Sequence, residues 1–170
     1  LKNCKDSIKV AQLAGFVAEK TNYHHGEQNL FETITKLAQD FVGSNNIPYL
    51  QKDGQFGTRL LGGKDAANAR YIFTKLSNIT RILFPKQDDN LLDRVVDEGE
   101  KVEPTYYLPI IPTILVNGCK AGIGTGWSTS IPCYNPKDLI SYISCHLNNK
   151  ELPKLVPWYK GFEGKIKKKD

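Results

Sequence analysis

Two segments near the start of the chain carry apolar residues at helical spacing, and this pattern constrains the fold more than any other feature. In residues 8–20 and again in residues 29–41, apolar side chains recur every three or four positions, as one face of an amphipathic helix requires. The polar stretch TNYHHGEQ separates the two segments, Asn29 suits an N-cap, and Gly43 lies just past the second segment. The sequence therefore predicts a helix-turn-helix. Such pairs can read DNA grooves, but more often they serve packing alone.

A stretch punctuated by glycines follows the two predicted helices. SNNIPYLQKDGQFGTRLLGGKD has glycines at positions 54, 57, 62 and 63 and is typical of loops and short hairpins, so it can form the wing that often follows a helix-turn-helix. YIFTKLS after it favours a strand, and Ser77 or Asn78 can cap a short helix that Pro85 ends. The acidic segment from Pro85 to Pro104 is predicted to be exposed.

The second half of the chain changes character near residue 111. YYLPIIPTILVNG and GIGTGWSTSIP indicate β-rich segments broken by proline and glycine, and PKDLISYISCHLNN indicates one further helix. We therefore expect an α+β fold in two parts. Residues 1–111 carry the helix-turn-helix and its β wing, and residues 112–170 begin a β-rich domain.

Composition excludes several classes of protein. The 170 residues contain no apolar run near the roughly 18 needed to span a membrane, and we expect no membrane partner. LKNCKDSIKV has neither an initiator Met nor the apolar core of a signal peptide, so we expect a piece of a longer protein. The 4 cysteines form no C-x-x-C pair, which argues against zinc or disulfides and favours a reducing, intracellular compartment. The net charge of +5 mildly favours a polyanionic partner.

Two glycine motifs look like nucleotide-binding loops but fail the spacing rules of those loops. GIGTGWS places glycines at 122, 124 and 126, and residue 127 is Trp where G-x-G-x-x-G requires glycine. GGKDAA lacks both the spacing of a phosphate-binding P-loop and the Ser or Thr that follows its lysine. The chain therefore carries no recognisable ATP site.

The adjacent His24 and His25 have two interpretations. Neighbouring side chains point in different directions, and no further His or Cys lies at ligand spacing, so a metal site is not predicted. The pair stands just before the second predicted helix, where free N–H groups and the helix dipole favour an anion. His25 can therefore donate a hydrogen bond to a docked phosphate, or the pair can be a surface turn without a further role.

The dipeptide Arg70-Tyr71 within GGKDAANARYIFT is a sharper candidate for chemistry. A tyrosine phenol that attacks phosphorus forms an aryl phosphodiester, which conserves the energy of a broken DNA backbone so that the strand can be resealed. Arginine supplies a planar, permanent charge for the non-bridging phosphate oxygens, and the nearby glycines allow close approach of a sugar-phosphate chain. The alternative is that Tyr71 is a structural aromatic residue, as most tyrosines are.

Longer motifs carry a family resemblance. KVAQLAGFVAEKTNYHHGE, LAQDFVGSNN, GQFGTRLLGGKDAANARYIFT, VEPTYYLPIIPTILVNG and GIGTGWSTSIP, in this order, closely resemble eukaryotic-type DNA topoisomerase II over essentially the whole chain. A bacterial-type gyrase subunit is a rival, but the forms YHHGE and GIGTGW favour the eukaryotic type. The resemblance implies part of the DNA breakage–reunion region, with a winged-helix domain in residues 1–111 and the beginning of a tower domain in residues 112–170.

The resemblance also implies roles for individual residues. Tyr71 matches the tyrosine that attacks a DNA phosphate and becomes linked to the 5′ end of the break. Arg70 matches an arginine that stabilises the transition state, and His25 matches a histidine near the scissile phosphate. Ile123 matches an isoleucine that wedges between base pairs and bends DNA, although the residue pattern alone predicts a buried strand position. We expect the DNA contacts to include Tyr23, His24, Asn29 and Lys64.

The chain departs from the family pattern at one place. The family usually reads NGAEGIGTG, whereas residues 117–126 read NGCKAGIGTG, with one extra residue and a lysine where an acidic residue is expected. The GIGTG that presents Ile123 is intact, but the extra residue puts the reach of Ile123 toward DNA in question.

Other parts of the family's reaction are expected outside these residues. In the family, Mg²⁺ is held by a glutamate and a D-x-D motif of a separate Toprim domain, ATP drives strand passage from further domains, and two subunits each cut one strand. We therefore expect double-stranded DNA and a second copy of the protein as partners, in the nucleus, with a viral or organellar compartment left open. We expect no complete cleavage by these residues alone. The rival from another class is a winged-helix module that binds DNA without chemistry.

Overall fold

The computed structural model describes residues 6–167, which divide into two compact units. The first unit comprises the residues up to Gln39 together with Pro48–Ile110, and the second comprises Asp40–Ile47 together with the residues from Ile111 onward. Helices and strands occur along the chain, so the predicted mixture of α and β structure is confirmed. Within residues 6–167, no helix has the length and apolar character that crossing a membrane requires.

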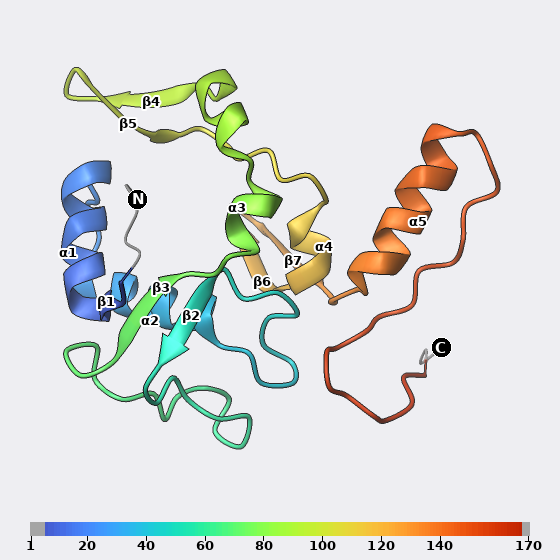
Figure 1. Cartoon of the computed structure of the whole chain (residues 1–170), viewed down its shortest axis with the longest axis horizontal. Coiled ribbons are helices and arrows are strands. Elements are labelled where there is room, and N and C mark those ends of the chain that lie inside the picture. Colours follow the sequence, from blue (N-terminus) through green and yellow to red (C-terminus); the bar gives the residue numbers. More distant parts are fainter. Residues whose placement is uncertain (1–5, 168–170) are drawn as a thin grey trace. The chain divides into compact units, whose positions relative to one another are not determined.

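A small antiparallel sheet lies in the first unit (Figure 1) and consists of β1 (Ile8–Lys9), β2 (Leu50–Asp53) and β3 (Phe73–Leu76). The strand order is β1-β3-β2, so the predicted strand YIFTKLS lies at the centre. This position buries Thr74, which is 0% exposed and donates its hydroxyl to the carbonyl of Gln51 at 2.6 Å. The central strand therefore satisfies even its polar side chain inside the unit.

Helices α1 (Val10–Thr21) and α2 (Glu27–Ala38) form where the apolar spacing predicts them. Complete burial of one large apolar side chain contributes about 1.5–3 kcal/mol, so the shared core fixes both helices against the sheet and against the segment that precedes β3. The buried cluster consists of Val10, Leu13, Ala14, Leu30, Ile34, Ala38, Leu50, Phe56, Ala69 and Ile72.

The ends of α2 differ from the prediction. The helix begins at Glu27 because Gly26 already has the extended conformation of an N-cap, with φ −61° and ψ 143°. Asn29 lies inside the first turn and donates its backbone N–H to the Gly26 carbonyl at 3.0 Å, so the prediction that Asn29 caps the helix is wrong. The helix ends at Ala38, and Gln39 leaves the helical path with a buried side chain.

The remainder of the first unit contains short elements. The predicted short helix is α3 (Thr80–Leu83), which stops before Pro85 but has Ile79 rather than Ser77 or Asn78 at its N-cap. The acidic segment forms the 3-10 helix η1 (Lys86–Leu91) and a hairpin of β4 (Arg94–Asp97) and β5 (Glu100–Pro104). Most side chains of this segment are exposed, as predicted.

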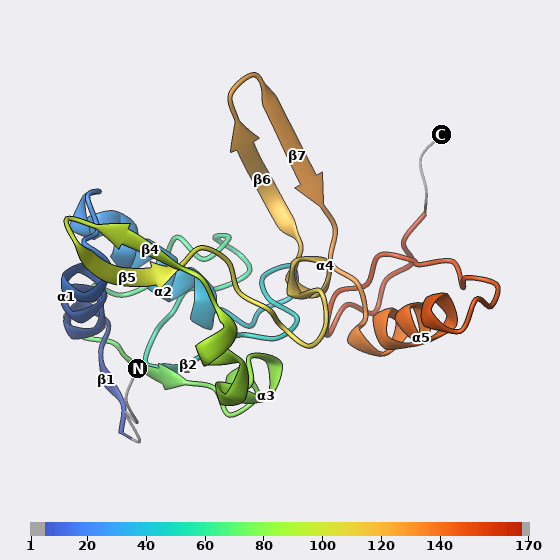
Figure 2. The ribbon, with the colours of Figure 1, turned by 90° about the horizontal axis from the view of Figure 1, so that it is seen from above.

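The second unit contains α4 (Thr113–Asn117), the hairpin of β6 (Cys119–Gly124) and β7 (Trp127–Ile131), and α5 (Pro136–Leu147). Figure 2 shows this hairpin extending away from α4 and α5. The expected β structure in GIGTGWSTSIP and the predicted helix are confirmed, and the structure adds that β6 and β7 pair as a hairpin. The expectation of β structure in TILVN is wrong, because the Pro112 carbonyl accepts the N–H groups of Leu115 and Val116 and burial of Val116 overrides the weak β preference.

Asn46 is the polar centre of the second unit. Its side-chain nitrogen lies 2.8 Å from the carbonyl oxygen of Val116, 3.3 Å from that of Tyr134 and 3.1 Å from that of Trp158. Its side-chain oxygen accepts the backbone N–H of Lys160 at 2.9 Å. These bonds explain why the short segment Asp40–Ile47 belongs to the second unit, although its neighbours in sequence belong to the first.

Candidate functional site

The dipeptide Arg70-Tyr71 lies between two anchored residues. Ala69 and Ile72 are buried, and their carbonyls accept the N–H groups of Ala11 at 3.1 Å and Val10 at 3.0 Å. These donors belong to the first turn of α1, whose N–H groups have no partner within the helix. The backbone is therefore held on both sides of the dipeptide, while Arg70 is exposed and Tyr71 is 75% exposed. This exposure places Tyr71 outside the buried core.

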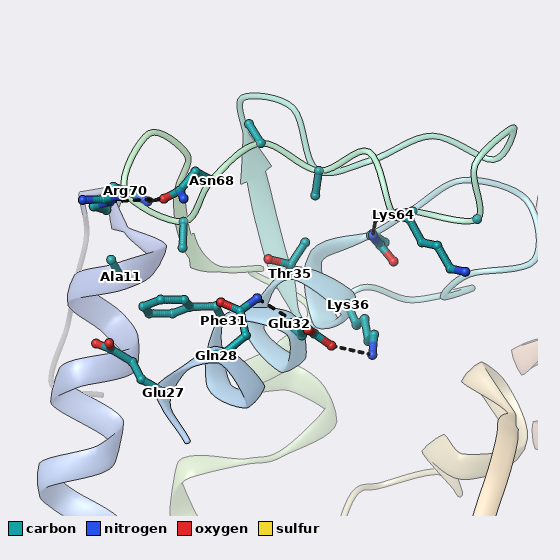
Figure 3. A pocket seen from close by; sticks show the side chains of 16 residues that line it. Ala11, Glu27, Gln28, Phe31, Glu32, Thr35, Lys36, Lys64, Asn68 and Arg70 are labelled. Atoms are coloured by element: carbon teal, nitrogen blue, oxygen red, sulfur yellow. Dashed lines mark hydrogen bonds and ion pairs between the residues drawn. The ribbon is translucent and has the colours of Figure 1, made fainter. Parts of the chain in front are cut away.

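Asn68 holds the side chain of Arg70. Its amide oxygen accepts the backbone N–H of Arg70 at 3.0 Å and the Nε–H at 3.4 Å, and Figure 3 shows the two side chains together at one end of the loop. The Asn68 carbonyl also accepts the N–H of Tyr71 at 2.9 Å. Sequence reasoning missed this residue. The signal that could have found it is an asparagine placed two residues before a functional side chain, because Asn bonds readily to backbone two positions on.

The glycine-rich loop before the dipeptide is folded tightly on itself. A Cβ on Gly57 would lie 2.5 Å from the Gly63 carbonyl oxygen, and a Cβ on Gly63 would lie 2.3 Å from Gln39. Gln39 donates its amide to the carbonyls of Phe56 at 2.8 Å and Gly63 at 3.2 Å. At these two positions the glycines are required by contacts within the protein, not by approach of a sugar-phosphate chain.

A carboxylate closes the exposed part of this loop. Asp65 accepts the backbone N–H and the hydroxyl of Thr58, both at 2.8 Å, and these hydrogen bonds lower the pKa of Asp65 below its ordinary value. Between these residues Leu60 is 90% exposed, Lys64 is exposed, and Gly62 faces open space. The hydrogen bonds between Thr58 and Asp65 therefore hold the two ends of this loop together, and the loop exposes the cationic side chain of Lys64 and the apolar side chain of Leu60 to solvent.

The two histidines in the turn before α2 contact different residues. The rings of His25 and Tyr23 meet edge to face with centroids 5.3 Å apart. His24 instead places Nε2 3.1 Å from Oδ2 of Asp97 in β4, although its own side chain is 74% exposed. His24, His25 and Asn29 are all exposed, so the turn and the first turn of α2 present polar groups to solvent.

A cleft runs along α2, from Glu27 to Gln39 just past the helix end, and separates it from the loop that carries Arg70. Its lining includes Glu27, Gln28 and Glu32 on one wall and Lys64 and Arg70 on the other (Figure 3). The structure thus brings two of the predicted site residues, Arg70 and Lys64, to one cleft that follows the length of α2. Tyr71 and His25 are not among the lining residues.

Ile123 lies near the tip of the β6–β7 hairpin and is 85% exposed. The expectation from residue pattern alone, a buried strand position, is wrong because, among residues 6–167, β6 pairs with β7 alone and the side chain stays exposed. β6 spans one residue more than β7 between the pairs Cys119–Ile131 and Gly122–Thr129, which marks a β-bulge. The bulge lies within Cys119–Gly122, the stretch that departs from the expected family pattern, and it precedes Ile123.

Comparison of the chain with known proteins shows its family. Residues 1–170 match the family model for the A-type subunits of DNA gyrase/topoisomerase IV, and the chain belongs to this family. The DNA topoisomerase 2 of Arabidopsis thaliana is 57% identical over 98% of this chain, and that of Candida albicans is 58% identical over 97%. The structure of the DNA-binding, cleavage and re-ligation domain of Plasmodium falciparum topoisomerase II matches with a TM-score of 0.92 and 56% identity, over 96% of this chain and 22% of that one. The predicted resemblance to eukaryotic-type DNA topoisomerase II is confirmed.

The chain spans a small part of its relatives. It covers 11% of the length of the Arabidopsis and Candida proteins. Among residues 6–167, no group of three or more His, Cys, Asp or Glu side chains could hold a metal ion.

Proposed function

We propose that this chain supplies the DNA-cleaving tyrosine of a type II DNA topoisomerase and acts within a longer protein. The hydroxyl of Tyr71 attacks a DNA phosphate. The new bond between its oxygen and phosphorus forms as the bond from phosphorus to the 3′ oxygen breaks, and the phenol proton is replaced by phosphorus while the 3′ oxygen gains a proton. The product is a 5′-phosphotyrosine and a free 3′ hydroxyl. Reversal of this exchange reseals the strand without ATP at that step.

One observation carries the proposal: in a chain of this family, an exposed arginine and tyrosine stand between two buried, hydrogen-bonded residues. In the proposed reaction Arg70 stabilises the charge that builds on the non-bridging oxygens. His25 lies in the turn just before the N-terminus of α2, where an anion is favoured, and donates a hydrogen bond near the scissile phosphate.

The proposed DNA surface extends over both parts of the chain. Residues 1–111 act as a winged-helix domain and residues 112–170 as the beginning of a tower domain. Ile123, exposed near the hairpin tip, wedges between base pairs and bends the duplex. The residues proposed to contact DNA are Tyr23, His24, Asn29 and Lys64. Because His24 already contacts Asp97 through Nε2, its contact with DNA uses Nδ1 or displaces Asp97.

The intact protein is proposed to need groups that the described residues do not supply. Mg²⁺ and ATP would act from other domains, and no step here is assigned to them because no described cluster of side chains fits a metal. Two copies of the protein would each cut one strand. We propose the nucleus as the location of the protein. An organelle or a viral compartment is an alternative, and one relative from Dictyostelium discoideum is named mitochondrial.

The decisive experiment is Tyr71→Phe in the intact enzyme. We expect the covalent DNA adduct to disappear while DNA affinity stays near that of the wild type, because the phenyl ring remains and only the nucleophilic oxygen is lost. Persistence of the adduct would refute the assignment. In a second assay, the 170-residue chain alone should bind DNA weakly, and supercoiled DNA incubated with it and Mg²⁺ should stay supercoiled.

A further inference from the structure

Asn68 contacts both members of the Arg70-Tyr71 dipeptide. Its amide oxygen accepts the backbone N–H of Arg70 at 3.0 Å and the Nε–H at 3.4 Å, and its carbonyl accepts the N–H of Tyr71 at 2.9 Å. The two bonds to the backbone N–H groups of Arg70 and Tyr71 form a turn of the kind that Asn favours. The bond to Nε is not needed for that turn, and it acts on the side chain of Arg70 alone.

The bond to Nε directs the guanidinium without occupying its outer nitrogens. Arginine carries five N–H donors in one plane, so holding Nε restricts the plane and leaves four donors on Nη1 and Nη2. No ion pair joins Arg70 to a carboxylate within the part of the chain that the structure describes. Because the amide of Asn68 is neutral, the full charge of Arg70 remains for an anion.

We propose that Asn68 is a positioning residue that aims the guanidinium of Arg70 at a phosphodiester. The inference rests on the proposed function, in which Arg70 stabilises the phosphate during attack by Tyr71. The two outer nitrogens match the two non-bridging oxygens of a phosphodiester. A long exposed side chain loses freedom when it binds, and Asn68 removes part of that freedom before DNA arrives.

Three substitutions at position 68 separate orientation from charge in the intact enzyme. Asn68→Ala removes both side-chain bonds and should slow covalent adduct formation about tenfold, less than the roughly 10²–10³-fold lost when a stabilising donor is removed outright. Asn68→Ser keeps a weaker acceptor and should recover part of the rate. Asn68→Asp keeps the acceptor but neutralises Arg70, so it should be no faster than Asn68→Ala. Asn90→Ala, at an exposed asparagine of η1, is the matched control.

Single-turnover rates at saturating DNA distinguish positioning from a structural role. If Asn68 acts through Arg70, Asn68→Ala should have no further effect in the Arg70→Ala background. A structural role in the turn predicts the same slowing with and without Arg70, and that result would overturn the inference. So would a wild-type rate for Asn68→Asp.

The same variants distinguish failure of this inference from failure of the proposed function. If Arg70→Ala slows adduct formation but Asn68→Ala does not, the role of Asn68 is refuted and the proposed function stands. If neither Arg70→Ala nor Tyr71→Phe changes adduct formation, the proposed function is refuted, and the role of Asn68 with it.

Discussion

Asn46 should be among the most sensitive positions of the second unit. Replacing it with alanine removes the group that satisfies three carbonyls and one backbone N–H from distant parts of the chain. The side-chain amide has only two hydrogens for three carbonyls, so one hydrogen is shared, and we count three full hydrogen bonds. At about 1 kcal/mol net for each bond, Asn46→Ala should lower the free energy of unfolding by about 3 kcal/mol.

Asn46→Asp tests the same reasoning with almost no change of volume. A carboxylate at this position would face the three carbonyl oxygens without a hydrogen to donate. Asn46 is only 5% exposed, so water cannot screen the repulsion. We therefore expect Asn46→Asp to destabilise the unit more than Asn46→Ala does. A smaller effect of Asp would show that the carbonyls are not held by this side chain.

The chain contains a convenient probe for this experiment. Both tryptophans lie in the second unit. Trp127 is already 84% exposed, so the change in fluorescence during urea unfolding comes mainly from the partly buried Trp158 and reports the stability of that unit. Asn148→Ala is the matched control, because the side chain of Asn148 makes one exposed hydrogen bond, to the Ser144 carbonyl at 2.7 Å, and its loss should cost less than about 1 kcal/mol. Equal shifts of the urea midpoint for the two alanine variants would refute the reasoning.

Three further predictions concern packing, pH and thiol reactivity. Gly57→Ala should destabilise the first unit by more than about 2 kcal/mol in urea unfolding, because φ is +95° and a Cβ would lie 2.5 Å from a backbone oxygen. The control is Gly62→Ala, which should cost only about 1 kcal/mol because Gly62 has φ +61° but faces open space. The hydrogen bond and charge of Arg81 lower the pKa of Asp89, so this pair stabilises the fold above the ordinary carboxyl pKa and loses that contribution as pH falls through the lowered value. Asp89→Asn should therefore reduce the stability difference between pH 7 and pH 3 by less than about 1 kcal/mol, since the pair is partly exposed. Burial raises the pKa of the Cys133 thiol, so mass spectrometry should find Cys133 unmodified by iodoacetamide at neutral pH until urea unfolds the second unit.

Elements with a periodic pattern of apolar residues could be predicted from the sequence. The roles of polar side chains that bond to backbone groups could not. Apolar spacing predicted α1 and α2, and the composition of GIGTGWSTSIP predicted β structure around Ile123 but not the hairpin that exposes it. Nothing in the sequence predicted the roles of Gln39 and Asn46, because each binds carbonyl groups that every residue type possesses. A polar side chain at the end of a helix or in a loop looks the same in sequence whether it is solvated or holds a unit together.

The glycines near Tyr71 show a related limit. The sequence places them beside a candidate DNA site, and close approach of DNA is one physical reason for glycine. In the structure, a Cβ on Gly54 would lie 2.9 Å from the side chain of Ile72, while Gly57 and Gly63 lie against each other. Only Gly62 of this group faces open space. Three of the four glycines thus shape the loop itself, and their effect on DNA is through the position of that loop.

The extra residue in NGCKAGIGTG illustrates how a strand can absorb an insertion without changing what it presents. Adding one residue to a regular strand turns every later side chain to the opposite face, and such a change would point Ile123 away from its expected direction. A bulge sets two residues against one and so restores the alternation. Here the register shifts between Cys119 and Gly122, and regular pairing resumes with Ile123 opposite Ser128. A bulge at this place would let the strand accommodate the extra residue while keeping Ile123 on its face of the hairpin, which is compatible with the wedge role proposed for Ile123.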